Sequence, residues 1–309
     1  MEFLDEVHDP ILDGEFAGGY HVHQEAYTRT IPVMHVPIMS SSREDDGLRG
    51  RELEDYDSSL GSMNWLSGHT RPDSASTVSL AKRDGPKLKD LRAAMKEVER
   101  LHRTAAVGLL IVPVPLDDCI VVSFADSSWA NAEGLKTQTG RLLLLAPRSV
   151  LATNAAASIV DHKSKRTPRV VRSTLAGEAN ATDSGVDAAW FFASFLSEIL
   201  TAEPATKSKP CLDIYPVTDC KSLYDAVHQM TPSLLEKRTA IDIYSIRENT
   251  LVKNFRWCPT DRMLADALTK ADEALKETLM RFMMYPVLSL VDTTWSSELR
   301  GGEGDRTTS

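Results

Sequence analysis

The sequence has few cysteines and no long apolar segment. Its four cysteines, Cys119, Cys211, Cys220 and Cys258, are well separated and form no C-x-x-C pair, and their apolar surroundings predict reduced residues of the core. No apolar run approaches the ~18 residues needed to cross a bilayer. The N-terminal MEFLDEVHDP is acidic where a signal peptide would be basic. We therefore expect no membrane partner and a location in the cytosol or nucleus.

Basic residues are scarce in the first sixty positions. There, fourteen Asp and Glu stand against four Arg and no Lys, so this segment carries a surplus of ten negative charges and the remainder is close to neutral. A basic run without any acid, HKSKRTPRVVR, follows at 162–172. We expect Lys163, Lys165 and Arg166 to bind nucleic-acid phosphates, although most short basic runs are only solvated surface.

Three regions are predicted along the chain. Residues 1–112 form an acidic region that we expect to be partly disordered, with an exposed loop at 40–59 and an amphipathic helix at 86–104. Residues 116–275 have the pattern of an α/β domain. Residues 276–309 form a C-terminal extension whose tail, from residue 295 onward, has no apolar pattern and is expected to be mobile.

The α/β region alternates between strands and helices. Buried strands are predicted at 119–126, 140–147 and 157–161, followed by a long helix that Ser173 or Thr174 caps. The predicted elements that follow are a strand at 211–218, helices at 221–230 and 233–249, a strand at 251–259 and a final helix opened by Thr260 or Asp261.

Four acidic residues lie at the ends or starts of these elements, in the order strand, helix, strand, helix: Asp126, Glu178, Asp219 and Asp266. A cluster of bare carboxylates is stable only when cations neutralise it, and hard oxygen ligands favour Mg²⁺ or Mn²⁺. The pattern therefore predicts a metal-dependent nuclease. Taken singly, each acid has a simpler role as a helix cap, as a partner of the helix dipole or, for Asp266, as the partner of Lys270.

Other candidate sites are weaker. His21 and His23 share one face of a predicted strand, but two histidines without a third firm ligand rarely bind metal. Trp129, Trp190 and Trp257 are expected in the core rather than stacked on bases. Ser173 and Ser222 have no histidine and aspartate in an arrangement that indicates a serine hydrolase.

The motifs of the α/β region resemble a known family. Seven motifs, taken in order, resemble those of the ribonuclease H domain of copia-type retrotransposon polyproteins. In this chain they read FADSSWA, KTQTG, HKSKR, RSTLAGEA, TDCKSL, RTAIDIYSIRE and ADALTK. The corresponding family motifs are D-x-D-W-A, S-T-T-G, W-x-S-K-K, S-S-T-E-A-E, D-N-x-S, K-H-I-D-I and A-D-x-L-T-K. Upstream, YHVHQEAY and LGSMNWLSGHTRPDSAS resemble the end of the same family's reverse transcriptase. No Y-x-D-D polymerase turn is present. We therefore expect a C-terminal part of a larger polyprotein, without polymerase activity.

The resemblance implies an α/β fold of the ribonuclease H type: a mixed five-stranded sheet flanked by helices, preceded by a partial and poorly ordered reverse transcriptase segment. It also implies cleavage of the RNA strand of RNA/DNA hybrids with two Mg²⁺ ions, or Mn²⁺ in their place, and association with the remainder of the reverse transcriptase. By carry-over, Asp126 would bridge both ions, Glu178 and Asp219 would hold the ion nearer the leaving oxygen, and Asp266 would hold the ion that presents water.

Several positions depart from the family pattern. Ser128 replaces the second Asp of D-x-D-W-A, His162 replaces a tryptophan, Ala240 replaces a histidine, and the two residues before Glu178 also differ. These changes leave a second hypothesis open, namely a catalytically degenerate retroelement fragment that binds nucleic acid or a protein partner without turnover. An integrase of the same broad fold would need three acids ending in a glutamate, which ADALTK does not supply.

Overall fold

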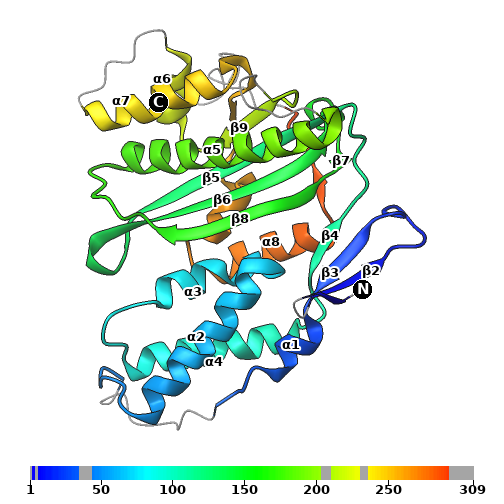
Figure 1. Ribbon diagram of the computed structural model, residues 1–309. Coiled ribbons are helices and arrows are strands. Elements are labelled where there is room, and N and C mark those ends of the chain that lie inside the picture. The colour runs from blue at the N-terminus through cyan, green and yellow to red at the C-terminus, as the bar shows by residue number, and fades with distance from the viewer. Residues whose placement is uncertain (1, 4–5, 35–43, 203–209, 230–235, 292–309) are drawn as a thin grey trace, which may run out of the picture.

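The computed structural model describes residues 2–3, 6–34, 44–202, 210–229 and 236–291 of the chain. A five-stranded sheet lies at the centre, with helices on both faces, a helical unit beside it and a smaller N-terminal sheet (Figure 1). Within the described ranges, no helix is both long enough and apolar enough to cross a membrane.

The central sheet has the strand order β8–β6–β5–β9–β10. Its members are β5 (Cys119–Ala132), β6 (Lys136–Pro147), β8 (Ser158–Arg166), β9 (Ile214–Thr218) and β10 (Arg256–Trp257). Strands β5, β6 and β8 are antiparallel neighbours, whereas β9 runs parallel to β5 and β10 runs parallel to β9. This mixed sheet flanked by helices is the ribonuclease H-like α/β fold that the resemblance implies, so the predicted fold class is confirmed.

Strand β5 is buried on both faces. Its apolar residues accordingly follow one another without alternating with polar ones. Ile120 and Val122 belong to the core under helix α8 (Glu273–Met284), and Val121 belongs to the core under helix α5 (Thr174–Thr201). A central strand covered on both sides has this pattern. The three strands predicted at the start of this region are confirmed, and each is longer than predicted.

Helices α5, α6 (Lys221–His228) and α7 (Lys237–Asn249) pack together on one face of the sheet, opposite α8 (Figure 1). As predicted, α5 is capped by Ser173, whose side-chain oxygen accepts a hydrogen bond from the Ala176 amide. The strand predicted at 251–259 is confirmed only as the two residues of β10. Before it, residues 252–254 form a 3-10 turn that places Phe255 in the core shared with α6 and α7.

The final helix begins later than predicted. Residues 260–262 and 264–268 form two 3-10 helices, and α8 starts at Glu273, where the Asp272 carboxylate accepts hydrogen bonds from two backbone amides. Helix α8 crosses the boundary predicted at residue 275, and its apolar face packs into the core beneath the central sheet. It therefore belongs to the α/β domain. The tail predicted to be mobile lies outside the described residues.

The region predicted to be partly disordered contains a helical unit. Its helices are α1 (Glu25–Thr30), α2 (Arg51–His69), α3 (Ala75–Ala81) and α4 (Leu88–Arg103). Tyr56, Leu60, Met63 and Leu66 of α2 are buried in an apolar core of this unit. They are three or four positions apart and so share one helix face, although the segment is acidic and rich in serine. The predicted loop is therefore wrong for residues 51–59, whereas residues 40–43 lie outside the described part.

Short strands complete the fold. A small antiparallel sheet has the order β1 (Glu2–Phe3), β2 (Glu6–Pro10), β3 (Tyr20–His23) and β4 (Leu109–Ile111). The pair β7 (Ala155–Ala156) and β11 (Val287–Leu288) is also antiparallel. Strand β4 leads toward the central sheet, since the amide of the next residue, Val112, donates to the Ser158 hydroxyl of β8 at 2.8 Å.

A buried ionic network joins the helical unit to α8. Asp73 is fully buried and accepts hydrogen bonds from Arg71 and Arg100, with Nη–Oδ2 distances of 2.8 and 2.7 Å. Arg100 also pairs with Glu97, whose Oε2 lies 2.9 Å from Nζ of Lys276 on α8. Buried charges are tolerated only where opposite charges and hydrogen bonds compensate them. The network therefore fixes how the helical unit is attached to the α/β domain.

Candidate metal centre

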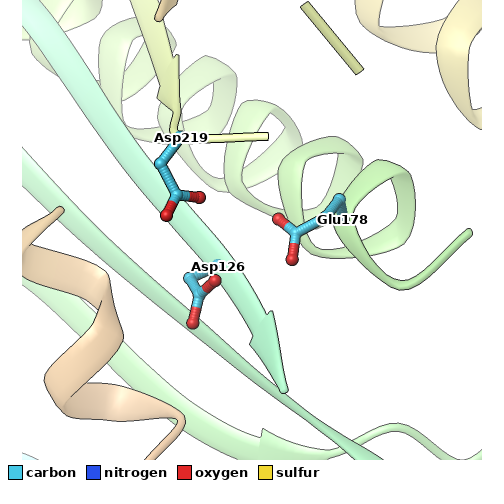
Figure 2. Close-up of side chains that lie close together, drawn as sticks. All are labelled: Asp126, Glu178 and Asp219. Atoms are coloured by element: carbon cyan, nitrogen blue, oxygen red, sulfur yellow. The ribbon is translucent and has the colours of Figure 1, made fainter. Parts of the chain in front are cut away.

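Three carboxylates meet at one end of the central sheet. Asp126 of β5, Glu178 of α5 and Asp219, directly after β9, can each offer one oxygen such that all three oxygens lie within 4.8 Å of one another. Figure 2 shows the three side chains pointing toward one another from two strands and a helix. Three of the four acids predicted from the sequence therefore converge as expected.

The sheet register brings the two aspartates together. Strands β5 and β9 are parallel neighbours, with Phe124 opposite Val217, and Asp126 and Asp219 each lie two residues further along. Glu178 reaches this point because α5 packs closely on β5 at Gly177. A Cβ at Gly177 would lie 2.6 Å from the Ser127 hydroxyl oxygen, so the absence of a side chain permits this approach.

Hydroxyl groups hold the carboxylates in place. The Ser127 hydroxyl and amide donate to Glu178 Oε1 at 2.9 and 3.2 Å, and the Thr260 hydroxyl donates to Asp219 Oδ2 at 2.8 Å. The Thr269 hydroxyl donates to Asp126 Oδ2. Sequence reasoning missed all three hydroxyl residues. Only Ser127 could have been identified from the sequence, because it directly follows Asp126.

The electrostatics of this pocket favour a bound cation. Burial, together with the charge of Asp266, raises the pKa of Asp126 to about 7, and burial with the charge of Asp126 raises the pKa of Glu178 well above its ordinary value. Burial also raises the pKa of Asp219. In addition, Glu178 Oε2 is buried without a hydrogen-bond partner. An unpartnered buried carboxylate oxygen beside two other carboxylates fits a hard divalent ion such as Mg²⁺ or Mn²⁺.

The fourth predicted acid, Asp266, lies beside this group and is held by a lysine. It is buried in the 3-10 helix Leu264–Leu268, not in the early turns of an α-helix as predicted. Nζ of Lys270 lies 2.7 Å from Asp266 Oδ1 and 3.9 Å from Asp126 Oδ2. The predicted pairing of Asp266 with Lys270 is therefore confirmed. Although burial opposes its charge, Asp126 and Asp266 together raise the pKa of Lys270.

The raised carboxyl pKa values predict how the stability of the metal-free protein depends on pH. Between about pH 4 and pH 7 the native pocket holds protons that the unfolded chain has released, so the stability that these groups contribute is lost as pH rises through that range. In EDTA, calorimetry should show an unfolding temperature that falls from about pH 5 to pH 8. At the higher pH, excess Mg²⁺ should raise it by a few degrees.

Asp126→Asn is the matched control for this titration, since it removes one charge and keeps the side chain's size. Its unfolding temperature in EDTA should depend less on pH, and its response to Mg²⁺ should be small. If Mg²⁺ does not change the unfolding temperature of the unaltered chain at pH 8, these carboxylates do not form a cation site.

The basic residues predicted to bind phosphates lie outside the carboxylate group, at the same height along the strands as Asp126. Lys163, Lys165 and Arg166 are on the edge strand β8, where Ser164 is opposite Gly140 of β6, and Gly140 is opposite Asp126. Two strand spacings separate them from Asp126 across the sheet, about 10 Å.

Two predictions about single residues are wrong. Trp129 is 49% exposed instead of buried, because β5 leaves its regular pairing after Ser128 and Ala130 adopts a left-handed conformation with φ of 54°. Its indole donates to the Val171 carbonyl at 3.0 Å. Cys211 is exposed, whereas Cys119 and Cys258 are buried as predicted.

The His21 and His23 rings stack, but among the described residues they belong to no group of three or more metal-binding side chains.

Comparisons with known proteins give structural neighbours only. No protein-family model and no curated protein sequence matches the chain. An RNase H1 from the halophilic archaeon Halobacterium salinarum NRC-1 is 15% identical, with a TM-score of 0.33 over 48% of this chain and 92% of that one. The N-terminal RNase H domain of a Mycobacterium tuberculosis protein, fused to maltose binding protein, is 13% identical, with a TM-score of 0.33 over 51% and 96%.

A third neighbour is LC11-RNase H1, isolated from compost by a metagenomic approach. It is 12% identical, with a TM-score of 0.30 over 52% of this chain and 98% of that one. Likenesses at these identities and TM-scores carry no information about activity. The fold class therefore rests on the strand order and strand directions of the central sheet.

Proposed function

We propose that this chain is a metal-dependent ribonuclease H that cleaves the RNA strand of RNA/DNA hybrids. The observation that carries the proposal is the convergence of Asp126, Glu178 and Asp219 at one end of a ribonuclease H-like sheet. Burial and mutual repulsion raise the pKa values of Asp126 and Glu178, and one Glu178 oxygen has no hydrogen-bond partner, so a bound cation would relieve both the repulsion and the missing contact. The seven ordered motifs further support an origin in a copia-type retrotransposon polyprotein.

The carboxylates have distinct parts in this proposal. Asp126, Glu178 and Asp219 would hold one Mg²⁺ or Mn²⁺ ion, and Asp126 with Asp266 would hold a second. Such ions polarise the scissile phosphate and lower the pKa of the attacking water. Lys270, in contact with the Asp266 carboxylate, supplies positive charge on that side of the pocket.

The protein's own groups prepare the pocket. Hydrogen bonds from Ser127, Thr260 and Thr269 set the direction in which the three carboxylates point. Burial of Asp126 and Glu178 keeps bulk water away from their oxygens, which strengthens their interaction with any cation. Such preorganisation means that the carboxylates need not reorient during the reaction.

The substitutions at positions 128, 162 and 240, which motivated a degenerate fragment, leave the hydrogen bonds of the carboxylates intact. His162 contacts the Ser67 carbonyl oxygen of α2 at 2.7 Å, and Ala240 lies in α7, which packs against α5. Ser128 is paired with Gln138 on β6. None of these three takes part in the hydrogen bonds described above for the carboxylates, so we favour the active enzyme over the degenerate binding module.

A cleavage assay tests the proposal. Incubated with a labelled RNA/DNA hybrid and Mg²⁺, the chain should cut the RNA strand and leave 5′-phosphate and 3′-hydroxyl ends. The same RNA as a single strand or as an RNA duplex should remain intact, and EDTA should stop the reaction. Binding of Mg²⁺ and of the hybrid without any cleavage would instead establish the degenerate binding module.

A further inference from the structure

A polar cavity lies outside the metal centre, along the edge strand β8. This groove has a volume of about 480 Å³ and lies where helices α2 and α3 approach β8 (Figure 1). Its basic lining residues are Lys82, Arg141, Lys163, Lys165 and Arg166. We call it the β8 groove. Because Lys82 directly follows α3 and the other four residues belong to the central sheet, both parts of the molecule form its lining.

The β8 groove has a surplus of positive charge. Its one carboxylate, Asp161, already accepts hydrogen bonds from Arg141 at 2.9 and 3.0 Å. Burial together with Arg166 lowers the pKa of Lys82, and burial together with Lys163 and Arg141 lowers the pKa of Lys165. Like charges gathered in a partly buried groove repel one another, and an anion in the groove would remove that repulsion.

Hydrogen bonds hold two of these cations, Lys82 and Arg166, in position. Nζ of Lys82 donates to Asn64 Oδ1 of α2 at 2.7 Å, and the Arg166 guanidinium donates to the Lys82 carbonyl oxygen. Solvated surface lysines are generally not fixed in this way. The β8 groove thus has preorganised donors, which lower the entropic cost of binding an anion.

The position of the β8 groove suggests what it binds. Ser164, one of its lining residues, is level with Asp126 through the pairs Asp126–Gly140 and Gly140–Ser164, about 10 Å across two strand spacings. A nucleic-acid strand carries a phosphate every few ångströms, so one substrate can reach both places.

We propose that the β8 groove binds backbone phosphates of the nucleic-acid substrate, on the part that flanks the cleaved bond. This inference rests on the proposed function, and it adds Lys82 and Arg141 to the three basic residues predicted from the sequence. It also gives the helical unit a part in substrate binding, because Lys82 and the Asn64 that fixes it both come from that unit.

Hybrid binding without cleavage tests this proposal. In the Asp219→Asn background, fluorescence anisotropy would give the Kd of a labelled RNA/DNA hybrid over a series of salt concentrations. Replacing both Lys82 and Lys165 by Gln should weaken binding about tenfold. It should also reduce the slope of log K against log salt by about 1.8, or about 0.9 for each phosphate that a lysine no longer neutralises.

A variant with the same loss of charge is the control. Replacing Lys89 and Lys96 by Gln alters two lysines of α4 that do not line the β8 groove, and it should leave Kd and slope nearly unchanged. Equal effects of the two double variants on hybrid binding would overturn the proposal. It would also be overturned if the Lys82 and Lys165 double variant lost binding of tripolyphosphate, a small phosphate anion, but kept the affinity of the unaltered groove for the hybrid. Failure of the proposed function is distinguished separately, because it appears as absent cleavage by the unaltered chain.

Discussion

Asp219→Asn should abolish hybrid cleavage, lowering the rate by about a thousandfold or more. The substitution keeps the side chain's size and its hydrogen bond from Thr260, but it removes one negative charge from the three carboxylates that approach within 4.8 Å. Each ~1.4 kcal/mol of charge stabilisation lost in the transition state lowers the rate tenfold, so a loss of several kcal/mol gives an effect of this size. Single-turnover cleavage at saturating Mg²⁺ measures this loss.

The matched control for this variant is Asp261→Asn. Asp261 is an exposed aspartate next to Thr260, and it does not belong to the three-carboxylate group. Its replacement should leave cleavage within about twofold. Because Asp219→Asn relieves repulsion between buried carboxylates, the metal-free variant should be at least as stable as the unaltered chain. Full cleavage by Asp219→Asn would remove Asp219 from the proposed site.

Asp73→Ala should have the largest effect on stability, lowering the free energy of unfolding by about 3–5 kcal/mol. The Asp73 carboxylate is fully buried between the guanidinium groups of Arg71 and Arg100, so its loss leaves buried positive charge without a partner. Urea unfolding followed by circular dichroism measures the difference. Glu25→Ala is the control, because the Glu25–Arg29 pair is exposed and exposed pairs contribute about 1 kcal/mol at most.

The ionic network should also respond to pH in the opposite sense to the metal centre. Burial alone would raise the pKa of Asp73, but Arg71 and Arg100 outweigh burial and hold its pKa well below the ordinary range. Its contribution is therefore present above about pH 4 and is lost only in strong acid. A stability loss below about 1 kcal/mol for Asp73→Ala at pH 7 would contradict this account of the network.

Much of the metal centre could be predicted because the relevant information is local. Asp126 and Asp219 each follow an apolar run of the length of a buried strand, and Glu178 follows a recognisable helix cap at Ser173. Strand β5 continues to Ala132, so Asp126 lies within it, but the parallel pairing of β5 with β9 still brings Asp126 level with Asp219. The convergence of these three acids therefore follows from sequence patterns together with the fold that the motifs imply.

Other features depend on contacts between distant residues and were predicted poorly. The segment around Asp266 forms a 3-10 helix that packs directly on Gly140, where a Cβ would lie 2.6 Å from Leu268 Cβ. Helical periodicity in the sequence does not record such a contact. Of the partners of Asp73, Arg71 is only two residues away, but Arg100 is 27 positions away on α4. The exposure of Trp129 depends on an irregularity in strand pairing after Ser128, which no residue pattern in the sequence indicates.

Crystallography of the chain with bound Mn²⁺ tests the central claim most directly, because the anomalous signal locates the ion independently of any activity. We expect an anomalous peak in contact with one carboxylate oxygen each of Asp126, Glu178 and Asp219. A peak elsewhere, or three carboxylates too far apart to share an ion, would contradict the account.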